Sequence, residues 1–213
     1  MKINGYLEHT ALKQGMTEIN IRDNLELCVA YNVPVIVIPP SFVKYASSLN
    51  IKEKISICTV IGFPLGYNTL KTKLFEMEEA ISNGADEIDL VIDNSLLKEN
   101  NWDIINYELA EYRKACEGKI LKIIVETSLL SRSDLDNIVN SLINNRVDFI
   151  KTSTGFVGGG AKLEDIKFLK IFFGNKIKIK ASGGIKTKDQ ALEFIDAGAD
   201  RIGSSSTKLI IEN

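Results

Sequence analysis

The sequence predicts one domain, residues 1–213, with the (β/α)8 architecture of a TIM barrel. Eight short apolar runs alternate with segments whose apolar residues have helical spacing. The runs are rich in Ile and Val, as is typical of parallel strands that are covered by helices. A chain of 213 residues, 45% of them hydrophobic, is also long enough to bury one substantial core.

The strands are expected where five or six residues form a mostly apolar run. In chain order these runs are YLEHT (6–10), PVIVI (34–38), SICTVI (56–61), EIDLVI (87–92), LKIIVE (121–126), DFIKT (148–152), KIKAS (178–182) and RIGSS (201–205). Helices are expected between them. The clearest helical faces are formed by Leu70, Leu74, Met77 and Ile81 after the third strand, and by Leu135, Ile138, Val139 and Leu142 after the fifth.

A ten-residue pattern occurs three times and favours a closed barrel over an open, doubly wound sheet. The copies are AISNGADEID (80–89), LINNRVDFIK (142–151) and FIDAGADRIG (194–203). They lie 62 and 52 residues apart, and each spacing is close to two strand–helix units. Their last position holds Asp89, Lys151 and Gly203, so equivalent places in the fold carry a carboxylate, an amine and a glycine.

Composition and charge exclude several classes of protein. The 26 basic and 28 acidic residues give a net charge of −2 without a long run of either sign, which argues against nucleic-acid binding. No run of about 18 apolar residues predicts a membrane span, and the start MKINGYLEHTALK lacks a secretory apolar stretch, so we expect a cytoplasmic protein. Cys28, Cys58 and Cys116 lack paired spacing, and we expect reduced, mostly buried thiols.

Two lysines stand where the sixth and seventh strands are expected to end. Lys151 follows the apolar Phe149 and Ile150, and Lys180 lies within IKIKASGGI. A single lysine at a strand end usually extends into solvent, but two on neighbouring strands, each followed by small residues, are harder to explain that way. Active sites of such barrels lie at the carboxyl ends of the strands, so we interpret both lysines as candidate site residues.

The residue types at these positions fit Schiff-base chemistry. A lysine has an ordinary pKa of about 10.4, and desolvation or a neighbouring cation makes its neutral amine available near pH 7. Lys151 and Lys180 could supply that pairing. The neutral amine attacks a carbonyl, and the resulting Schiff base turns the adjacent carbon into an enamine nucleophile. Asp89 is placed to transfer the protons, although it could instead cap a turn.

The last two loops are candidates for holding a phosphate. ASGGI (181–185) and GSSS (203–206) bring together Gly183, Gly184, Gly203, Ser204 and Ser205. Backbone N–H groups and Ser hydroxyls in such turns can bind phosphate without a basic patch. The parts describe a Schiff-base aldolase whose partner is a small phosphorylated sugar. Since His9 is the only histidine, we expect neither a metal nor a cofactor. Glu126 has two open interpretations, a buried structural acid or a group that supports the site.

Six motifs together resemble the deoxyribose-phosphate aldolase family nearly from end to end. They are TVIGFPLG (59–66), GADEIDLVI (84–92), ETSLL (126–130), KTSTGF (151–156), KASGGI (180–185) and RIGSSS (201–206). The resemblance implies a (β/α)8 barrel that reversibly cleaves 2-deoxy-D-ribose 5-phosphate into glyceraldehyde 3-phosphate and acetaldehyde without a metal. It implies that Lys151 forms the Schiff base, Asp89 transfers protons and Lys180 perturbs Lys151. It also implies phosphate binding by Gly155, Gly183, Gly184, Ser204 and Ser205.

The chain departs from the family pattern at three places. Glu8 stands where the family commonly has Asp, Ile38-Pro39-Pro40 replaces a small or polar residue followed by Asn-Pro, and the chain end lacks a tyrosine that some members use. Two alternatives stay open: a Schiff-base aldolase of the transaldolase or fructose-phosphate kind, and a barrel that only binds a sugar phosphate. The sequence also leaves open whether the chain forms a homodimer or a higher homo-oligomer.

Overall fold

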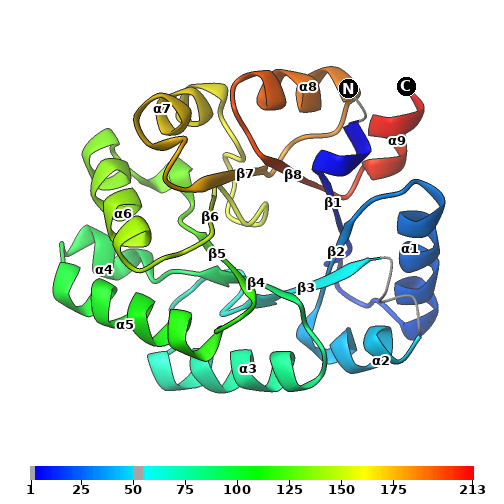
Figure 1. Ribbon diagram of the computed structural model, residues 1–213, viewed down its shortest axis with the longest axis horizontal. Coiled ribbons are helices and arrows are strands. Elements are labelled where there is room, and N and C mark those ends of the chain that lie inside the picture. The colour runs from blue at the N-terminus through cyan, green and yellow to red at the C-terminus, as the bar shows by residue number, and fades with distance from the viewer. Residues whose placement is uncertain (1–2, 50–54) are drawn as a thin grey trace.

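The computed structural model describes residues 3–49 and 55–213, and within these ranges eight parallel strands close into a barrel (Figure 1). Each strand pairs with the next one in the sequence, and β8 pairs with β1. The strands are β1 (Leu7–Thr10), β2 (Val35–Ile38), β3 (Ser56–Ile61), β4 (Glu87–Val91), β5 (Ile120–Ile124), β6 (Phe149–Lys151), β7 (Lys178–Ser182) and β8 (Arg201–Ser204). The predicted (β/α)8 barrel is therefore confirmed.

Helices form an outer layer around the barrel (Figure 1). The α-helices are α1 (Glu18–Ala30), α2 (Val43–Ser48), α3 (Leu70–Ser82), α4 (Asn94–Lys98), α5 (Trp102–Ala115), α6 (Arg132–Asn144), α7 (Leu163–Phe173), α8 (Lys188–Asp196) and α9 (Thr207–Glu212). Short 3-10 helices are η1 (Ile3–Tyr6), η2 (Pro40–Phe42) and η3 (Thr127–Leu129). Side chains of Thr17, Thr69, Ser131 and Thr187 accept backbone N–H groups at the starts of α1, α3, α6 and α8, which fixes where these helices begin.

Two expectations about strand ends are corrected by the structure, and both matter for the site. The fifth strand ends at Ile124 rather than at Glu126, because Glu126 has a left-handed backbone with φ of 55°. Lys151 is the last residue of β6, as expected. The seventh strand has the predicted bounds, 178–182, but the prediction that Lys180 ends it is wrong, because Lys180 is its third residue and two more residues follow. Lys180 and Lys151 are nevertheless direct partners in the β6–β7 pairing.

The apolar core is divided between two places. The larger part fills the space between the barrel and its helices, with Leu90, Ile123, Ile150 and Ile179 among its members. Inside the barrel, an apolar cluster is formed by residues of β2 and β3: Val35, Val37, Cys58 and Val60. The inward positions of other strands carry buried charged residues, among them Glu8 of β1, Asp89 of β4 and Lys122 of β5. The interior is thus apolar near β2 and β3 and strongly charged elsewhere.

Two further expectations can be compared with the structure. Cys28, Cys58 and Cys116 are buried free thiols, as predicted. Among the residues described, no helix combines the length and the apolar character that crossing a membrane requires.

Candidate active site

The three predicted residues Asp89, Lys151 and Lys180 meet inside the barrel. Lys151 Nζ lies 2.8 Å from Asp89 Oδ2, and Lys180 Nζ lies 2.7 Å from the same oxygen. Asp89 and Lys180 are fully buried, and Lys151 is 4% exposed. One carboxylate oxygen therefore accepts hydrogen bonds from two ammonium groups that come from adjacent strands.

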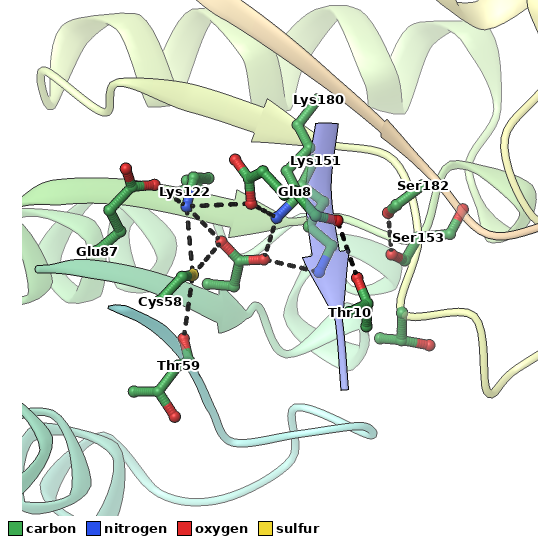
Figure 2. A network of polar contacts seen from close by, with 12 residues as sticks. Glu8, Thr10, Cys58, Thr59, Glu87, Lys122, Lys151, Ser153, Lys180 and Ser182 are labelled. Carbon is green, nitrogen blue, oxygen red and sulfur yellow. Dashed lines mark hydrogen bonds and ion pairs between the residues drawn. The ribbon is translucent and has the colours of Figure 1, made fainter. Parts of the chain in front are cut away.

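A third lysine, Lys122, belongs to the same cluster and was not among the predicted residues (Figure 2). Its Nζ donates to the other oxygen of Asp89, Oδ1, at 2.9 Å and lies 2.6 Å from Glu87 Oε2. Cys58 Sγ is 3.3 Å from both Lys122 Nζ and Asp89 Oδ1. Lys122 lies inside the apolar run LKIIVE, so the sequence contains the same signal that identified Lys151 and Lys180, a lysine within a buried strand.

Two glutamates and an arginine complete the charged interior. Glu8 on β1 accepts a hydrogen bond from Lys180 Nζ, and its other oxygen lies 2.8 Å from Arg201 Nη1. Arg201 Nη1 also lies 2.6 Å from Glu87 Oε2. Glu8, one of the departures from the family pattern, therefore reaches Lys180 directly. Sequence reasoning did not identify Glu87 or Arg201, because strand periodicity alone does not say which strands face each other across the barrel.

The neighbouring lysines keep Asp89 and Glu8 ionised. Burial by itself would raise the pKa of Asp89, but the ammonium groups of Lys122, Lys151 and Lys180 hold it well below its ordinary value. Burial likewise opposes ionisation of Glu8, and Lys122 and Lys180 together lower its pKa to about 2. Asp89 is therefore a carboxylate at neutral pH, able to accept a proton from a reacting group.

The lysines do not share one protonation behaviour. Burial lowers the pKa of Lys151, the neighbouring Lys180 ammonium lowers it further, and the attraction of Asp89 compensates only in part. Burial also acts on Lys180, but Asp89 and Glu8 outweigh it and raise the pKa. The same balance, with Asp89 first among the attracting groups, raises the pKa of Lys122 well above its ordinary value. Lys151 is thus the amine of this cluster that most readily becomes neutral.

A cavity of about 250 Å³ opens above the carboxyl ends of the last strands, and Lys151 lines it. All six residues predicted to bind phosphate line the same cavity: Gly155, Gly183, Gly184, Gly203, Ser204 and Ser205. The exposed side chains of Lys13 and Lys186 also line it. Asp89, Lys122 and Lys180 lie below and are not part of its lining. The structure therefore places one amine of the cluster beside the glycine-rich loops.

Close packing explains two of the glycines. A Cβ atom on Gly203 would lie 3.2 Å from Lys180 Cε and 3.0 Å from Ser182 Cβ, so the glycine makes room for the lysine. Gly183 has φ of 90°, and a Cβ there would lie 2.9 Å from Gly160 Cα. The Ser204 hydroxyl is already engaged, donating to Ile185 O at 2.6 Å and accepting from Ser206 N at 3.0 Å. Ser204 thus joins the two loops, and Ser205 has the exposed side chain.

Glu8, Cys58 and Asp89 bring three potential metal ligands within 4.8 Å of one another. Ammonium groups already approach each of them: Lys122 Nζ lies 3.7 Å from Glu8, 3.3 Å from Cys58 and 2.9 Å from Asp89. Burial and the Asp89 charge also raise the pKa of the Cys58 thiol, which disfavours the thiolate that a metal needs. The chemistry of this donor set therefore fits lysines better than a metal ion.

Comparison with known proteins gives consistent results. The model of the DeoC/LacD family aldolase matches residues 6–207. A deoxyribose-phosphate aldolase of Clostridioides difficile is 46% identical over 207 residues, covering 97% of this chain and 94% of the relative. One of Ureaplasma urealyticum is 45% identical over 208 residues, covering 98% and 97%. Among solved structures, the aldolase QR15 has a TM-score of 0.94 at 38% identity, covering 99% of this chain and 94% of that one. A tetrameric deoxyribose phosphate aldolase from Aeropyrum pernix has a TM-score of 0.92 at 30% identity, covering 99% and 89%.

Proposed function

The chain belongs to the DeoC/LacD aldolase family, and from this premise we propose that it reversibly cleaves 2-deoxy-D-ribose 5-phosphate through a Schiff base at Lys151. The products are D-glyceraldehyde 3-phosphate and acetaldehyde. The relatives named deoxyribose-phosphate aldolase support this substrate, since they match this chain over nearly its whole length. The observation that carries the proposal is that Lys151, alone among the three amines that contact Asp89, also lines the cavity.

The proposed reaction uses Lys151 as the nucleophile and Asp89 for proton transfer. The neutral Lys151 amine attacks C1 of the open-chain sugar, and loss of water gives the protonated Schiff base. The C2–C3 bond then breaks as a base removes the C3 hydroxyl proton, and its electrons move into the Schiff base to form an enamine. Glyceraldehyde 3-phosphate leaves, the enamine carbon takes up a proton, and water releases acetaldehyde. Asp89, ionised and 2.8 Å from the amine, is the group proposed to exchange these protons.

The loops around the cavity are proposed to hold the phosphate end of the sugar. Gly155, Gly183 and Gly184 have positive φ values, a conformation that exposes backbone N–H groups in tight turns. Lys13 and Lys186 add positive charge at the same cavity. This arrangement supports a phosphorylated substrate with its aldehyde directed toward Lys151.

Borohydride trapping tests the assignment of the nucleophile. Reduction in the presence of acetaldehyde converts a Schiff base into a stable ethyl group on the lysine, which peptide mass spectrometry locates. We expect the label on Lys151 and none in a Lys151→Met variant. A label on Lys180 would contradict the assignment of Lys151 as the nucleophile, and no label at all would favour a barrel that only binds a sugar phosphate. A panel of phosphorylated ketoses and aldoses distinguishes the other Schiff-base aldolases.

The cell location and the assembly are further parts of the proposal. We propose a cytoplasmic enzyme that forms a homodimer or a higher homo-oligomer, and the relative from Aeropyrum pernix that is described as tetrameric supports assembly. Size-exclusion chromatography with light scattering measures the mass in solution. A mass equal to the 23.6 kDa of one chain would contradict the proposed homo-oligomer.

A further inference from the structure

Glu126 occupies an unusual position just after β5. Its side chain is buried, with 2% of its surface exposed, and it does not line the cavity. Its Oε2 atom accepts the backbone N–H of Thr154 at 3.0 Å and the hydroxyl of Thr154 at 2.9 Å. The other oxygen, Oε1, has no hydrogen-bond partner within the described residues. Glu126 therefore binds the loop after β6 through one residue.

The backbone around Glu126 is bent so that this contact can form. In a regular parallel pair, successive hydrogen bonds advance by two residues on both strands. Here Val125 N donates to Lys151 O at 3.1 Å and Thr127 N donates to Thr152 O at 2.8 Å, so the second strand advances by only one residue. Glu126 is the extra residue and has φ of 55°, a conformation that disfavours residues with a Cβ. Such bulges redirect side chains near active sites.

Thr154 connects Glu126 to the wall of the cavity through hydrogen bonds. Its hydroxyl oxygen accepts Phe156 N at 3.1 Å, which closes a turn around Gly155 with φ of 82°. Thr154, Gly155 and Phe156 all line the cavity that contains Lys151. The chain of hydrogen bonds from Glu126 to Thr154 to Phe156 thus sets the shape of one wall.

We propose that Glu126 is a positioning residue that fixes the Thr154–Phe156 turn for the phosphate end of the substrate. This inference rests on the proposed function, because it needs a phosphorylated sugar in the cavity. Glu126 acts through the two hydrogen bonds that it accepts from Thr154, and it takes no part in proton transfer. The unpartnered oxygen of Glu126 and its strained backbone both cost stability, which is consistent with a role in substrate binding rather than in stabilising the fold.

The test compares Glu126→Ala and Glu126→Gln on two substrates, 2-deoxyribose 5-phosphate and 2-deoxyribose. Glu126→Ala removes the oxygen that accepts both hydrogen bonds from Thr154 and is expected to raise KM for the phosphorylated sugar about 10- to 100-fold, while kcat changes little. Its kcat/KM for the unphosphorylated sugar should stay within about threefold of the unmodified enzyme. Glu126→Gln keeps a carbonyl oxygen that can accept both bonds, so its KM should return close to normal.

Two controls separate the possible failures. Thr154→Val deletes the hydroxyl and should raise KM in the same substrate-dependent way, whereas Thr154→Ser should not. Borohydride trapping of acetaldehyde on Lys151 should be unchanged in every variant that folds. If Glu126→Ala lowers activity equally for both sugars, or if Glu126→Gln is inactive with an altered pH profile, the positioning role is wrong. If the unmodified enzyme fails to cleave deoxyribose phosphate, it is the proposed function that fails.

Discussion

At the scale of single residues, the number of carboxylates around each amine distinguishes chemically identical side chains. Lys151 contacts one carboxylate, Asp89, whereas Lys180 contacts both Asp89 and Glu8. Burial favours the neutral amine in both lysines. For Lys180, Asp89 and then Glu8 outweigh burial and raise the pKa, whereas for Lys151 Asp89 is the attracting carboxylate and the Lys180 ammonium repels. Lys151 therefore becomes a neutral amine more readily, as the proposed nucleophile must, while its partner in the strand pairing stays an ammonium ion.

This balance predicts the behaviour of Lys180→Met. The substitution keeps the length of the side chain and removes an ammonium that lowers the pKa of Lys151, so that pKa should rise. Activity at neutral pH should fall about 10-fold or more, and the acid limb of the pH–rate profile should move to higher pH. Burial, the largest influence that lowers the pKa of Lys151, persists in the variant. Alkali should therefore still deprotonate the amine and restore part of the activity.

Lys122→Met is the matched control for that experiment. It also removes a buried lysine that contacts Asp89, but through the oxygen that Lys151 does not contact. The acid limb should therefore move less than in Lys180→Met. An unmoved limb in Lys180→Met, or equal shifts in both variants, would show that Lys180 does not tune Lys151.

At the scale of the element, helix α3 carries a buried lysine that the active site does not use. Lys73 is fully buried, its Nζ lies 5.9 Å from the centre of the Tyr112 ring, and it donates no hydrogen bond to any residue in the described ranges. Burial lowers its pKa, and the more distant charges of Glu108, Asp93 and Glu76 only partly compensate. The folded state therefore resists protonation of Lys73.

Lys73→Met is expected to stabilise the protein by about 1–3 kcal/mol at pH 7, because it removes the cost of burying a charge. A group with a lowered pKa destabilises the folded state most below that pKa. The gain should therefore shrink as the pH rises toward the unfolded pKa of about 10.4. Urea denaturation at pH 7 and pH 9.5 measures it. Lys71→Met, an exposed change on the same helix, should alter stability by less than about 0.5 kcal/mol. Destabilisation by Lys73→Met would mean that its contact with Tyr112 outweighs desolvation.

The elements themselves were largely predictable from sequence, and their exceptions have local causes. Strands were found from apolar runs because both faces of a barrel strand are buried. The end of β5 was missed because a left-handed glutamate has no signature in the residue types around Glu126. The repeat ending at Asp89, Lys151 and Gly203 did place three equivalent strand positions correctly, in β4, β6 and β8.

At the scale of the whole molecule, charged side chains hold distant parts of the chain together inside the barrel. Glu8 on β1 contacts Lys180 on β7 and Arg201 on β8, across sequence separations of 172 and 193 residues. Such contacts depend on how strands meet across a closed barrel. Sequence periodicity predicted the barrel and identified Lys151 and Lys180 in its strands. It could not show that Glu8 and Glu87 meet Lys122, Lys180 and Arg201.

Glu8 should make the stability of the barrel depend on acid. Its pKa falls from an ordinary 4.5 to about 2 in the folded chain, because Lys122 and Lys180 overcome the effect of burial. The corresponding stabilisation, on the order of 3 kcal/mol, is fully present above pH 4.5 and is lost as the pH falls toward 2. Glu8→Gln should lose this amount at pH 7 and show a flatter decline between pH 5 and pH 3.

Urea denaturation at a series of pH values measures both curves. Glu8→Asp keeps the charge and serves as the control, with a decline in acid that resembles that of the unmodified protein. Parallel curves for the unmodified protein and Glu8→Gln would show that other carboxylates determine its sensitivity to acid.

The pairing of β8 with β1 also means that the barrel is a ring without a topological first strand. Helix α9 contacts β1, and η1 leads directly into β1, so the first and last elements of the described chain both lie beside this strand (Figure 1). A circular permutant could join them through a short Gly/Ser linker and open between Glu117 and Gly118, where a side chain on Gly118 would meet no atom within 4 Å. This opening lies before β5, at the end of the barrel opposite the cavity.

The order of the strands in the chain would then start at β5 and finish at β4, while every strand would keep its neighbours in the barrel. Such a permutant should fold, and borohydride should still trap acetaldehyde on the residue that is now Lys151. An insoluble or untrappable product would mean that folding depends on the order of the strands in the chain and not only on which strands are neighbours in the barrel.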